Sequence, residues 1–107
     1  METRCARLRI KPGSLDAVRE WARTINSSRR DEALVTLRDE SVSVESVFLE
    51  SGEDGDFLIY YMRGADLTKS RAIAAESKHS IDAYHRDFMR EHTEERTLLE
   101  MLVDLAT

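Results

Sequence analysis

The histidine at position 85 is the residue in this 107-residue sequence best suited to carry chemistry. On the segment that begins near Ser80, apolar side chains recur at Ile81, Tyr84 and Phe88, which is the spacing of one helical face. His85 lies within this stripe, so we expect its imidazole to face the interior. An imidazole titrates near neutral pH and can act as base, acid or metal ligand. The alternative is a half-buried histidine that only hydrogen-bonds a strand residue, because buried polar groups usually find partners.

Two adjacent tyrosines and the only tryptophan are candidates to complete a site around His85. Tyr60 and Tyr61 lie on one expected strand, where neighbouring side chains point to opposite faces, so one of them should share a cavity with the histidine. We assign Tyr61 as its catalytic partner and Tyr60 as a ligand contact, because a phenol can orient a substrate or relay a proton. Trp21, on the apolar stripe of the first helix, is expected to bind ligand as well. Equally, both tyrosines could be packing residues.

A second group of residues is ionic. Arg7 and Arg9 share one face of the first strand, and we expect them to meet Glu100 and Asp104 of the last strand, with Glu45 on the same side. Opposite charges paired across strands stabilise a sheet by roughly 0.2–1 kcal/mol per pair. The functional alternative is an anion-binding floor in which an arginine binds a carboxylate or phosphate. In that interpretation Arg7, Arg9 and Glu45 are ligand-binding residues.

Other patterns argue against several kinds of site. His92 lies roughly 10 Å beyond His85 along a helix axis, which is too far for the two to bind one metal. Cys5 is the only cysteine, so neither an internal disulfide nor a cysteine-rich metal site can form. No glycine-rich phosphate loop or Gly-x-Ser-x-Gly elbow is present. We therefore predict no metal and no cofactor, and we give Glu40 and Asp82 structural roles at the start of a strand and in the first turn of a helix.

Composition and charge indicate one ordinary soluble domain over residues 1–107. Apolar residues make up 41% and charged residues 35% of the chain, and its net charge of −5 would repel nucleic acid. RNA binding through the face of a sheet would also need an aromatic residue on the first strand, which has none. No secretory signal follows the first residues, and the longest apolar run, residues 57–62, is too short to cross a bilayer. We predict a cytoplasmic protein that binds neither nucleic acid nor membrane.

Hydrophobic periodicity predicts the element order strand, helix, strand, strand, helix, strand. Strands are expected at residues 4–11, 42–50, 57–63 and 98–105, and helices at 15–25, 31–38 and 67–91, the last with a break near 78–80. Ser14, Asp66 and Ser80 are the expected helix caps. This is the α+β class with the split βαβ, ferredoxin-like pattern: a four-stranded antiparallel sheet in the order 4-1-3-2 with its helices on one face.

The strands at 42–50 and 57–63 carry apolar side chains on both faces. A sheet with one solvated face should instead alternate between apolar and polar residues. The helices can cover only one face, so we expect a second copy of the chain to cover the other. The sequence therefore predicts a homodimer.

Four stretches carry a resemblance to a known superfamily: RDEA at 30–33, ESVSVESVFLE at 40–50, FLIYYM at 57–62 and IDAYHRDF at 81–88. The sequence resembles the dimeric α/β-barrel superfamily, in which two ferredoxin-like protomers join their sheets into a barrel. It is similar to a small family of uncharacterised bacterial proteins within that superfamily. In several enzymes of the superfamily the active cavity lies between helices and sheet, where His85 would point.

The resemblance leaves the activity open, because the superfamily includes cofactor-free monooxygenases, haem-degrading enzymes, sugar mutarotases and ligand-binding modules. Haem degradation is disfavoured, because the first strand lacks an asparagine and Trp21 lies on the first helix. We predict a homodimeric α/β-barrel protein that binds or transforms a small molecule between helices and sheet. The alternative is a non-enzymatic dimeric interaction module, which the lack of a metabolite-sized cavity would favour.

Overall fold

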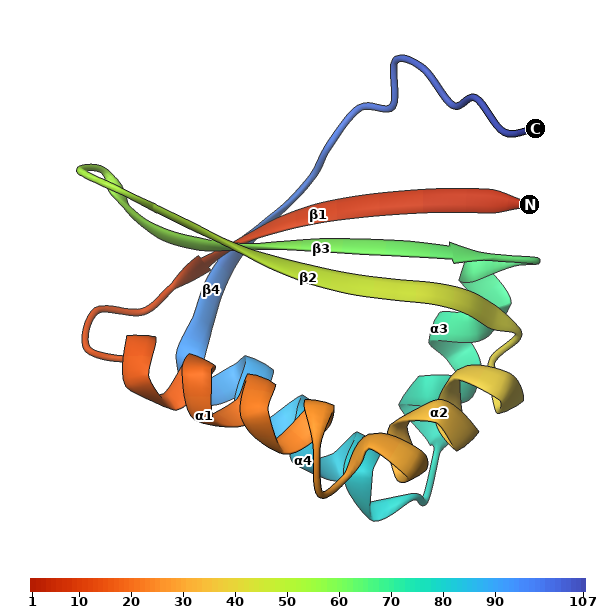
Figure 1. Ribbon diagram of the computed structural model, residues 1–107, viewed down its shortest axis with the longest axis horizontal. Coiled ribbons are helices and arrows are strands. Elements are labelled where there is room, and N and C mark those ends of the chain that lie inside the picture. Colours follow the sequence, from red (N-terminus) through yellow and green to blue (C-terminus); the bar gives the residue numbers. More distant parts are fainter.

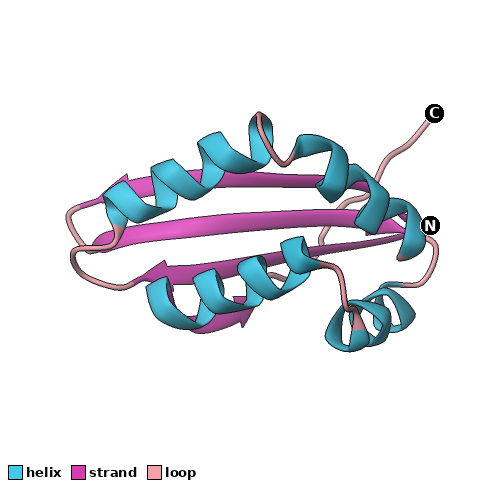
Figure 2. Ribbon diagram, turned by 90° about the horizontal axis from the view of Figure 1, so that it is seen from below, coloured by secondary structure: helices cyan, strands magenta, loops and turns pink.

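A four-stranded antiparallel sheet forms one layer of the molecule, and four helices form the other. The computed structural model describes residues 1–107. All four helices lie on the same face of the sheet (Figures 1 and 2). In chain order the elements are β1 (Glu2–Ile10), α1 (Leu15–Asn26), α2 (Arg30–Asp39), β2 (Val42–Gly52), β3 (Gly55–Gly64), α3 (Leu67–Glu76), α4 (Ser80–His92) and β4 (Thr93–Leu98).

The strand order is β2-β3-β1-β4, which is the order 4-1-3-2 read from the other edge. All three strand pairings are antiparallel. The β2–β3 hairpin closes where Gly52 pairs with Gly55, inside the turn-rich segment that the sequence placed there. The ferredoxin-like α+β class is therefore confirmed, and so is the break between α3 and α4. None of the helices is long and apolar enough to span a membrane.

The last strand is where the sequence prediction was wrong. β4 spans Thr93–Leu98 rather than residues 98–105, because the chain pairs with β1 directly after α4 ends. The residues beyond Leu98 form an irregular tail on the face away from the helices (Figure 1). Its apolar side chains are uncovered in the single chain: Leu102 is 83% exposed and Leu105 is 89% exposed.

The core lies between the sheet and α1 and α4. On β1 the even-numbered residues point toward the helices, and with residues of the neighbouring elements they make up the buried cluster: Ala6, Leu8, Ile10, Val18, Trp21, Leu58 and Phe88. The rings of Trp21 and Phe88 stack with centroids 4.6 Å apart and planes within 5°. This aromatic stack joins α1 to α4 beneath the middle of the sheet.

The helix caps agree only in part with the sequence. Asp66 caps α3 as expected, with its Oδ1 accepting a hydrogen bond from the Lys69 backbone N–H at 3.1 Å. Ser14 precedes α1, but its side chain makes no capping bond; its Oγ instead lies 2.9 Å from His92 Nδ1. Ser80 is the first residue of α4 rather than its cap.

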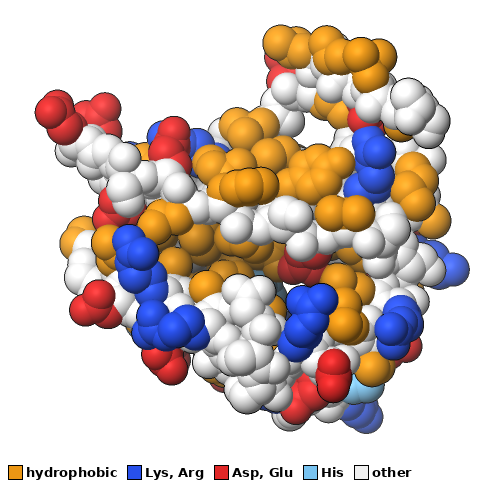
Figure 3. Space-filling view, in the orientation of Figure 1, with side chains coloured by type: hydrophobic (Ala, Val, Ile, Leu, Met, Phe, Trp, Pro, Cys, Tyr) orange, Lys and Arg blue, Asp and Glu red, His pale blue; other side chains and the backbone are white.

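The face of the sheet away from the helices, which we call the open face, carries a second set of apolar side chains. Register places Phe48 beside Ile59 and, on the same face, Tyr61 beside Cys5. Phe48 is 60% exposed. Figure 3 shows hydrophobic side chains gathered on this face beneath the tail.

Candidate functional site

A cavity of about 700 Å³ lies between the sheet and the helices. Its walls come from all four strands and all four helices. Figure 3 shows a hollow with hydrophobic side chains inside it at this level. Sites for small molecules typically measure roughly 300–1,000 Å³ and combine apolar walls with a few polar groups. The cavity is therefore large enough for a metabolite.

His85 on α4 lines this cavity, in the inward position that the helical spacing predicted. Its ring centroid lies 5.7 Å from that of Trp21 and 5.9 Å from that of Tyr60. Burial has the largest effect on the pKa of His85 and lowers it. The charge of Asp82 raises this pKa and the charge of Arg86 lowers it, so the net change is a decrease. The imidazole is therefore neutral near pH 7 and can accept a proton or a hydrogen bond.

Trp21 also lines the cavity. The residue is only 6% exposed, and its indole Nε1 has no hydrogen-bond partner within the protein. A buried N–H without an acceptor costs free energy, so such groups are rare. Because this nitrogen is itself inaccessible, Trp21 contributes its ring rather than its N–H to the wall of the cavity.

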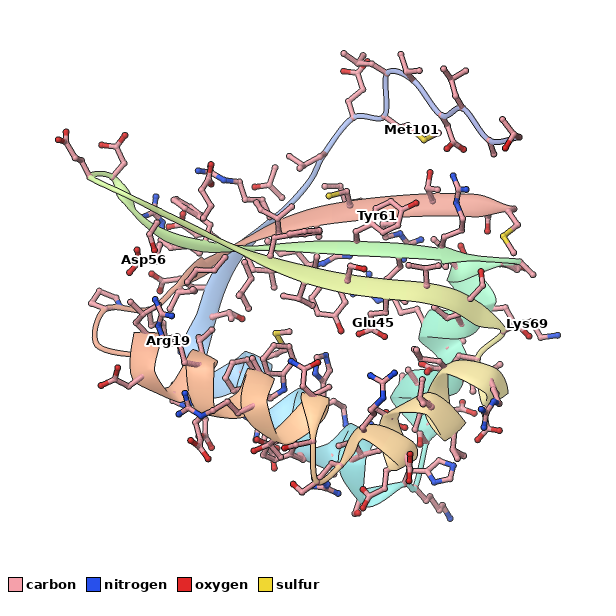
Figure 4. All side chains as sticks on the ribbon, viewed as in Figure 1. Arg19, Glu45, Asp56, Tyr61, Lys69 and Met101 are labelled. Atoms are coloured by element: carbon pink, nitrogen blue, oxygen red, sulfur yellow. The ribbon has the colours of Figure 1, made fainter.

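Three carboxyl groups gather at the β2 side of the cavity: Glu40, Glu45 and Asp82. Figure 4 shows Glu45 on the side of β2 that faces the helices. Burial, followed by the charge of Asp82, raises the pKa of Glu45 from 4.5 to about 7. Burial and the charges of Asp82, Glu45 and Asp39 raise the pKa of Glu40 to about 7 as well.

These groups can move protons at neutral pH. Two carboxyls that titrate near 7 can supply one acid and one base at the same time, beside a neutral imidazole. No group of three or more His, Cys, Asp or Glu side chains is arranged to hold a metal ion. The arrangement is thus suited to acid–base chemistry carried out by side chains.

The position of Glu45 differs from the sequence expectation, which placed it with Arg7 and Arg9. Glu45 pairs with Met62, and both line the cavity, so this glutamate lies on the face opposite the two arginines. A shift of one residue in the assumed phase of a strand is enough to reverse the face of every side chain on it.

The structure also reverses the positions that the sequence analysis assigned to the two tyrosines. Tyr61 pairs with Cys5 on the open face, where Figure 4 shows it pointing away from the helices, so it cannot contact a molecule beside His85. Tyr60 lines the cavity and takes the position next to the histidine. The alternation of the strand predicted that one tyrosine would do so, but it did not say which.

Arg7 and Arg9 lie on the open face and bind protein groups there. Arg7 forms a salt bridge with Glu50 at 2.9 Å and Arg9 one with Glu95 at 3.2 Å. Both guanidinium groups stack over the ring of Phe57, at 3.5 Å and 4.7 Å from its centroid.

The acidic partners expected for these arginines were therefore wrong. Asp104, in the tail, pairs with Arg63 instead, and no salt bridge involves Glu100. The physical reason is that β4 begins at Thr93, so the residues opposite β1 are those of segment 93–98 rather than 98–105.

Sequence reasoning missed Glu40 and Asp82 as members of the site. The local role of each residue, at the start of a strand or in the first turn of a helix, already explained its presence. Only the folded chain brings them to Glu45, which is 37 positions from Asp82 in the sequence. One signal was available: all three carboxyls fall in the stretches 40–50 and 81–88 that carry the superfamily resemblance.

Comparison with known proteins agrees with this geometry at the level of the fold. The sequence profile of a family of unknown function, DUF6176, matches residues 1–107. The chain belongs to the DUF6176 family. No curated protein matches it.

Among solved structures, the DUF6176 chain is similar to the L-rhamnose mutarotase FA22100 from Formosa agariphila. The TM-score is 0.66 at 19% sequence identity, over 99% of this chain and 100% of the mutarotase chain. At this identity the likeness establishes the fold alone, which is ferredoxin-like.

Proposed function

We propose that this protein binds a small hydroxylated molecule between its sheet and its helices and exchanges protons with it. The observation that carries the proposal is the cavity of about 700 Å³, in which the neutral His85 and the carboxyls of Glu40 and Glu45 face apolar walls. Hydroxyl groups of a ligand would pair with these polar side chains, and its ring would pack on the apolar walls. The alternative, an interaction module without a ligand, calls for a filled interior, and a cavity of about 700 Å³ argues against it.

The chemistry we propose is acid–base isomerisation of a sugar-like ligand, the kind of reaction for which the similar solved structure is named. Interconversion of aldose anomers needs a base to take the proton of the anomeric hydroxyl and an acid to protonate the ring oxygen. The ring C–O bond then breaks, and the same two groups act in reverse when it closes again. Glu45, Glu40 and His85 are the groups available for these transfers, because each can change protonation near pH 7 or accept a proton there.

The test measures anomer exchange and binding together. Interconversion of the two anomers would be followed by NMR, through their anomeric proton signals, for a panel of neutral aldoses that includes L-rhamnose. Binding would be followed by the fluorescence of Trp21, the only tryptophan. We expect acceleration at pH 7 for at least one sugar, and a loss of roughly 10²-fold or more in His85→Ala and Glu45→Gln.

A matched control is available on the helical surface. His79 is exposed and pairs with Asp39, so His79→Ala should keep the wild-type rate and binding. The proposal fails if no aldose binds or exchanges faster, or if His85→Ala behaves like His79→Ala.

We also propose that the open face is covered by a second copy of the chain. The support is its apolar surface: Phe48 is 60% exposed and Val44 41%. Exposed apolar patches of this kind on small domains usually mark interfaces. The apolar tail, tied to the same face by the Arg63–Asp104 pair, would add to the buried area.

Sedimentation at micromolar concentration tests this assembly. We expect twice the chain mass of 12.3 kDa for the wild type and a monomer for Phe48→Glu. Val35→Glu is the control, because Val35 is 41% exposed but lies on α2, away from the open face. A wild-type protein that sediments as a monomer would refute the homodimer.

A further inference from the structure

Five arginines line the cavity, and three of them, Arg4 on β1, Arg71 on α3 and Arg96 on β4, act on one another; the other two are Arg30 and Arg86. Register explains why the two strand residues point inward. Arg4 pairs with Met62, another lining residue, and Arg96 pairs with Leu8 of the core. Arg4 thus occupies a position in phase with the buried residues of β1, where an apolar side chain would be expected.

None of these three guanidinium groups has a partner in the protein. Six other arginines form ion pairs, and a seventh donates to a backbone carbonyl, but no salt bridge or hydrogen bond involves Arg4, Arg71 or Arg96. In a chain of net charge −5 with 21 acidic residues, three neighbouring arginines without a carboxylate are unusual.

The three charges also act on one another. Partial loss of water around Arg96 lowers its pKa, and the charges of Arg71 and then Arg4 lower it further. The charges that act on Glu40 and Glu45 are those of Asp39, Glu45 and Asp82, and the charges that act on Arg96 are those of Arg71 and Arg4, so these three arginines and these carboxyls form two clusters. Like charges held together without a counterion destabilise the fold, and a bound anion would relieve that repulsion.

We propose that Arg4, Arg71 and Arg96 form an oxyanion-binding subsite that holds a carboxylate or phosphate group of the ligand. Guanidinium groups bind such groups through paired, charge-assisted hydrogen bonds. The inference rests on the proposed function and narrows its substrate class: the ligand carries hydroxyls at the His85 end of the cavity and one anionic group at the arginine end. Arg71 and Arg96 are exposed, so the anion can reach the subsite from solvent.

The experiment separates the subsite from the rest of the cavity. Calorimetry and thermal unfolding would be measured with inorganic phosphate at constant ionic strength, in the wild type and in Arg71→Gln, Arg96→Gln and Arg19→Gln. Arg19 is an exposed arginine of α1 outside the cavity (Figure 4), so Arg19→Gln is the matched control. We expect phosphate to raise the unfolding temperature of the wild type and of the control. Each of the other two variants should lose affinity by roughly tenfold or more.

The stability of the variants without phosphate is a second readout. Removal of one charge should leave the unfolding temperature of Arg96→Gln equal to or above that of the wild type, whereas loss of a merely structural arginine would lower it. Because Arg71 is exposed on a helix, Arg71→Gln tests the subsite even if Arg96→Gln folds poorly. Equal phosphate affinity in Arg71→Gln and Arg19→Gln would overturn the subsite.

Sugars with and without an anionic group distinguish the anion subsite from the proposed function, and they distinguish a phosphate from a carboxylate. D-glucose 6-phosphate and D-glucuronate would be compared with D-glucose, with Trp21 fluorescence as the signal. We expect at least one anionic sugar to bind more tightly than glucose in the wild type, and that advantage to disappear in Arg71→Gln. If glucose binds as tightly as both anionic sugars, the proposal that the ligand is anionic is refuted, but the proposed function still stands. If phosphate binding depends on the arginines but no sugar changes the fluorescence of Trp21, the proposed function is refuted and the anion site is not.

Discussion

Glu45→Gln should stabilise this protein at pH 8 and leave its stability almost unchanged at pH 4. The pKa of Glu45 rises from 4.5 to about 7 on folding, because the carboxyl is buried beside Asp82. The folded state therefore holds a proton that the unfolded chain releases between these two values. The stabilisation contributed by this group is fully present below pH 4.5 and declines as the pH rises toward 7. Above pH 7 it no longer changes.

The size of the effect follows from the same pKa. A rise from 4.5 to about 7 corresponds to roughly 3 kcal/mol of destabilisation once the carboxylate is fully ionised. Glutamine has nearly the same shape and no charge, but its amide still loses water on burial, so we expect Glu45→Gln to recover about 1–2 kcal/mol at pH 8. Such a gain would indicate that the native glutamate is kept at a cost to stability, as residues that serve a function often are.

Urea unfolding of both proteins at pH 4, 6 and 8 measures this. Glu53→Gln is the control, since Glu53 lies in the exposed β2–β3 turn and should change stability little at any pH. The difference between Glu45→Gln and the wild type should grow as the pH rises. If that difference is the same at all three values, or if Glu45→Gln is less stable at pH 8, the glutamate is not held in a buried, acidic surrounding and the acid–base assignment falls with it.

Three further substitutions test the packing that positions the site. Phe88→Ala removes the ring stacked on Trp21 and should cost about 3–5 kcal/mol in urea unfolding, with a red shift of tryptophan emission; an unshifted spectrum would contradict the stack. Asp66→Ala removes the cap of α3 and should cost about 1 kcal/mol by the same assay, so an unchanged midpoint would mean that the cap contributes nothing. Gly64→Ala places a Cβ only 2.8 Å from the Ser41 backbone oxygen and should destabilise by about 1–3 kcal/mol; a neutral result would show that the β2 and β3 ends separate easily.

The residues of the candidate site were only partly predictable. His85 and Trp21 could be placed in the cavity because helical periodicity is a local property, and both lie on apolar stripes that must face the core. The orientation of strand residues was harder to predict, since the choice between Tyr60 and Tyr61 depends on which face of β3 packs against the helices. Alternation along a strand with apolar residues on both faces does not decide this.

The β4 error had a different cause. Residues 98–105 alternate and are apolar enough for a strand, whereas segment 93–98 is mostly polar. Strand position was decided by connectivity: α4 ends at His92, whose carbonyl accepts a hydrogen bond from the Lys11 backbone N–H, and the chain must pair with β1 from there. The apolar pattern of the tail instead fits the surface that we propose is covered by a second copy.

By itself, the sequence determined the order of the elements, the ferredoxin-like class and the inward faces of α1 and α4, because each follows from periodicity over short stretches of chain. Only the tertiary structure decided which carboxyls and arginines meet. Glu40, Glu45 and Asp82 form one cluster, and Arg4, Arg71 and Arg96 form another, from elements far apart in the chain. Charges carry no periodic signal, and their pKa values depend on burial and neighbours that exist only after the sheet and the helices have packed together.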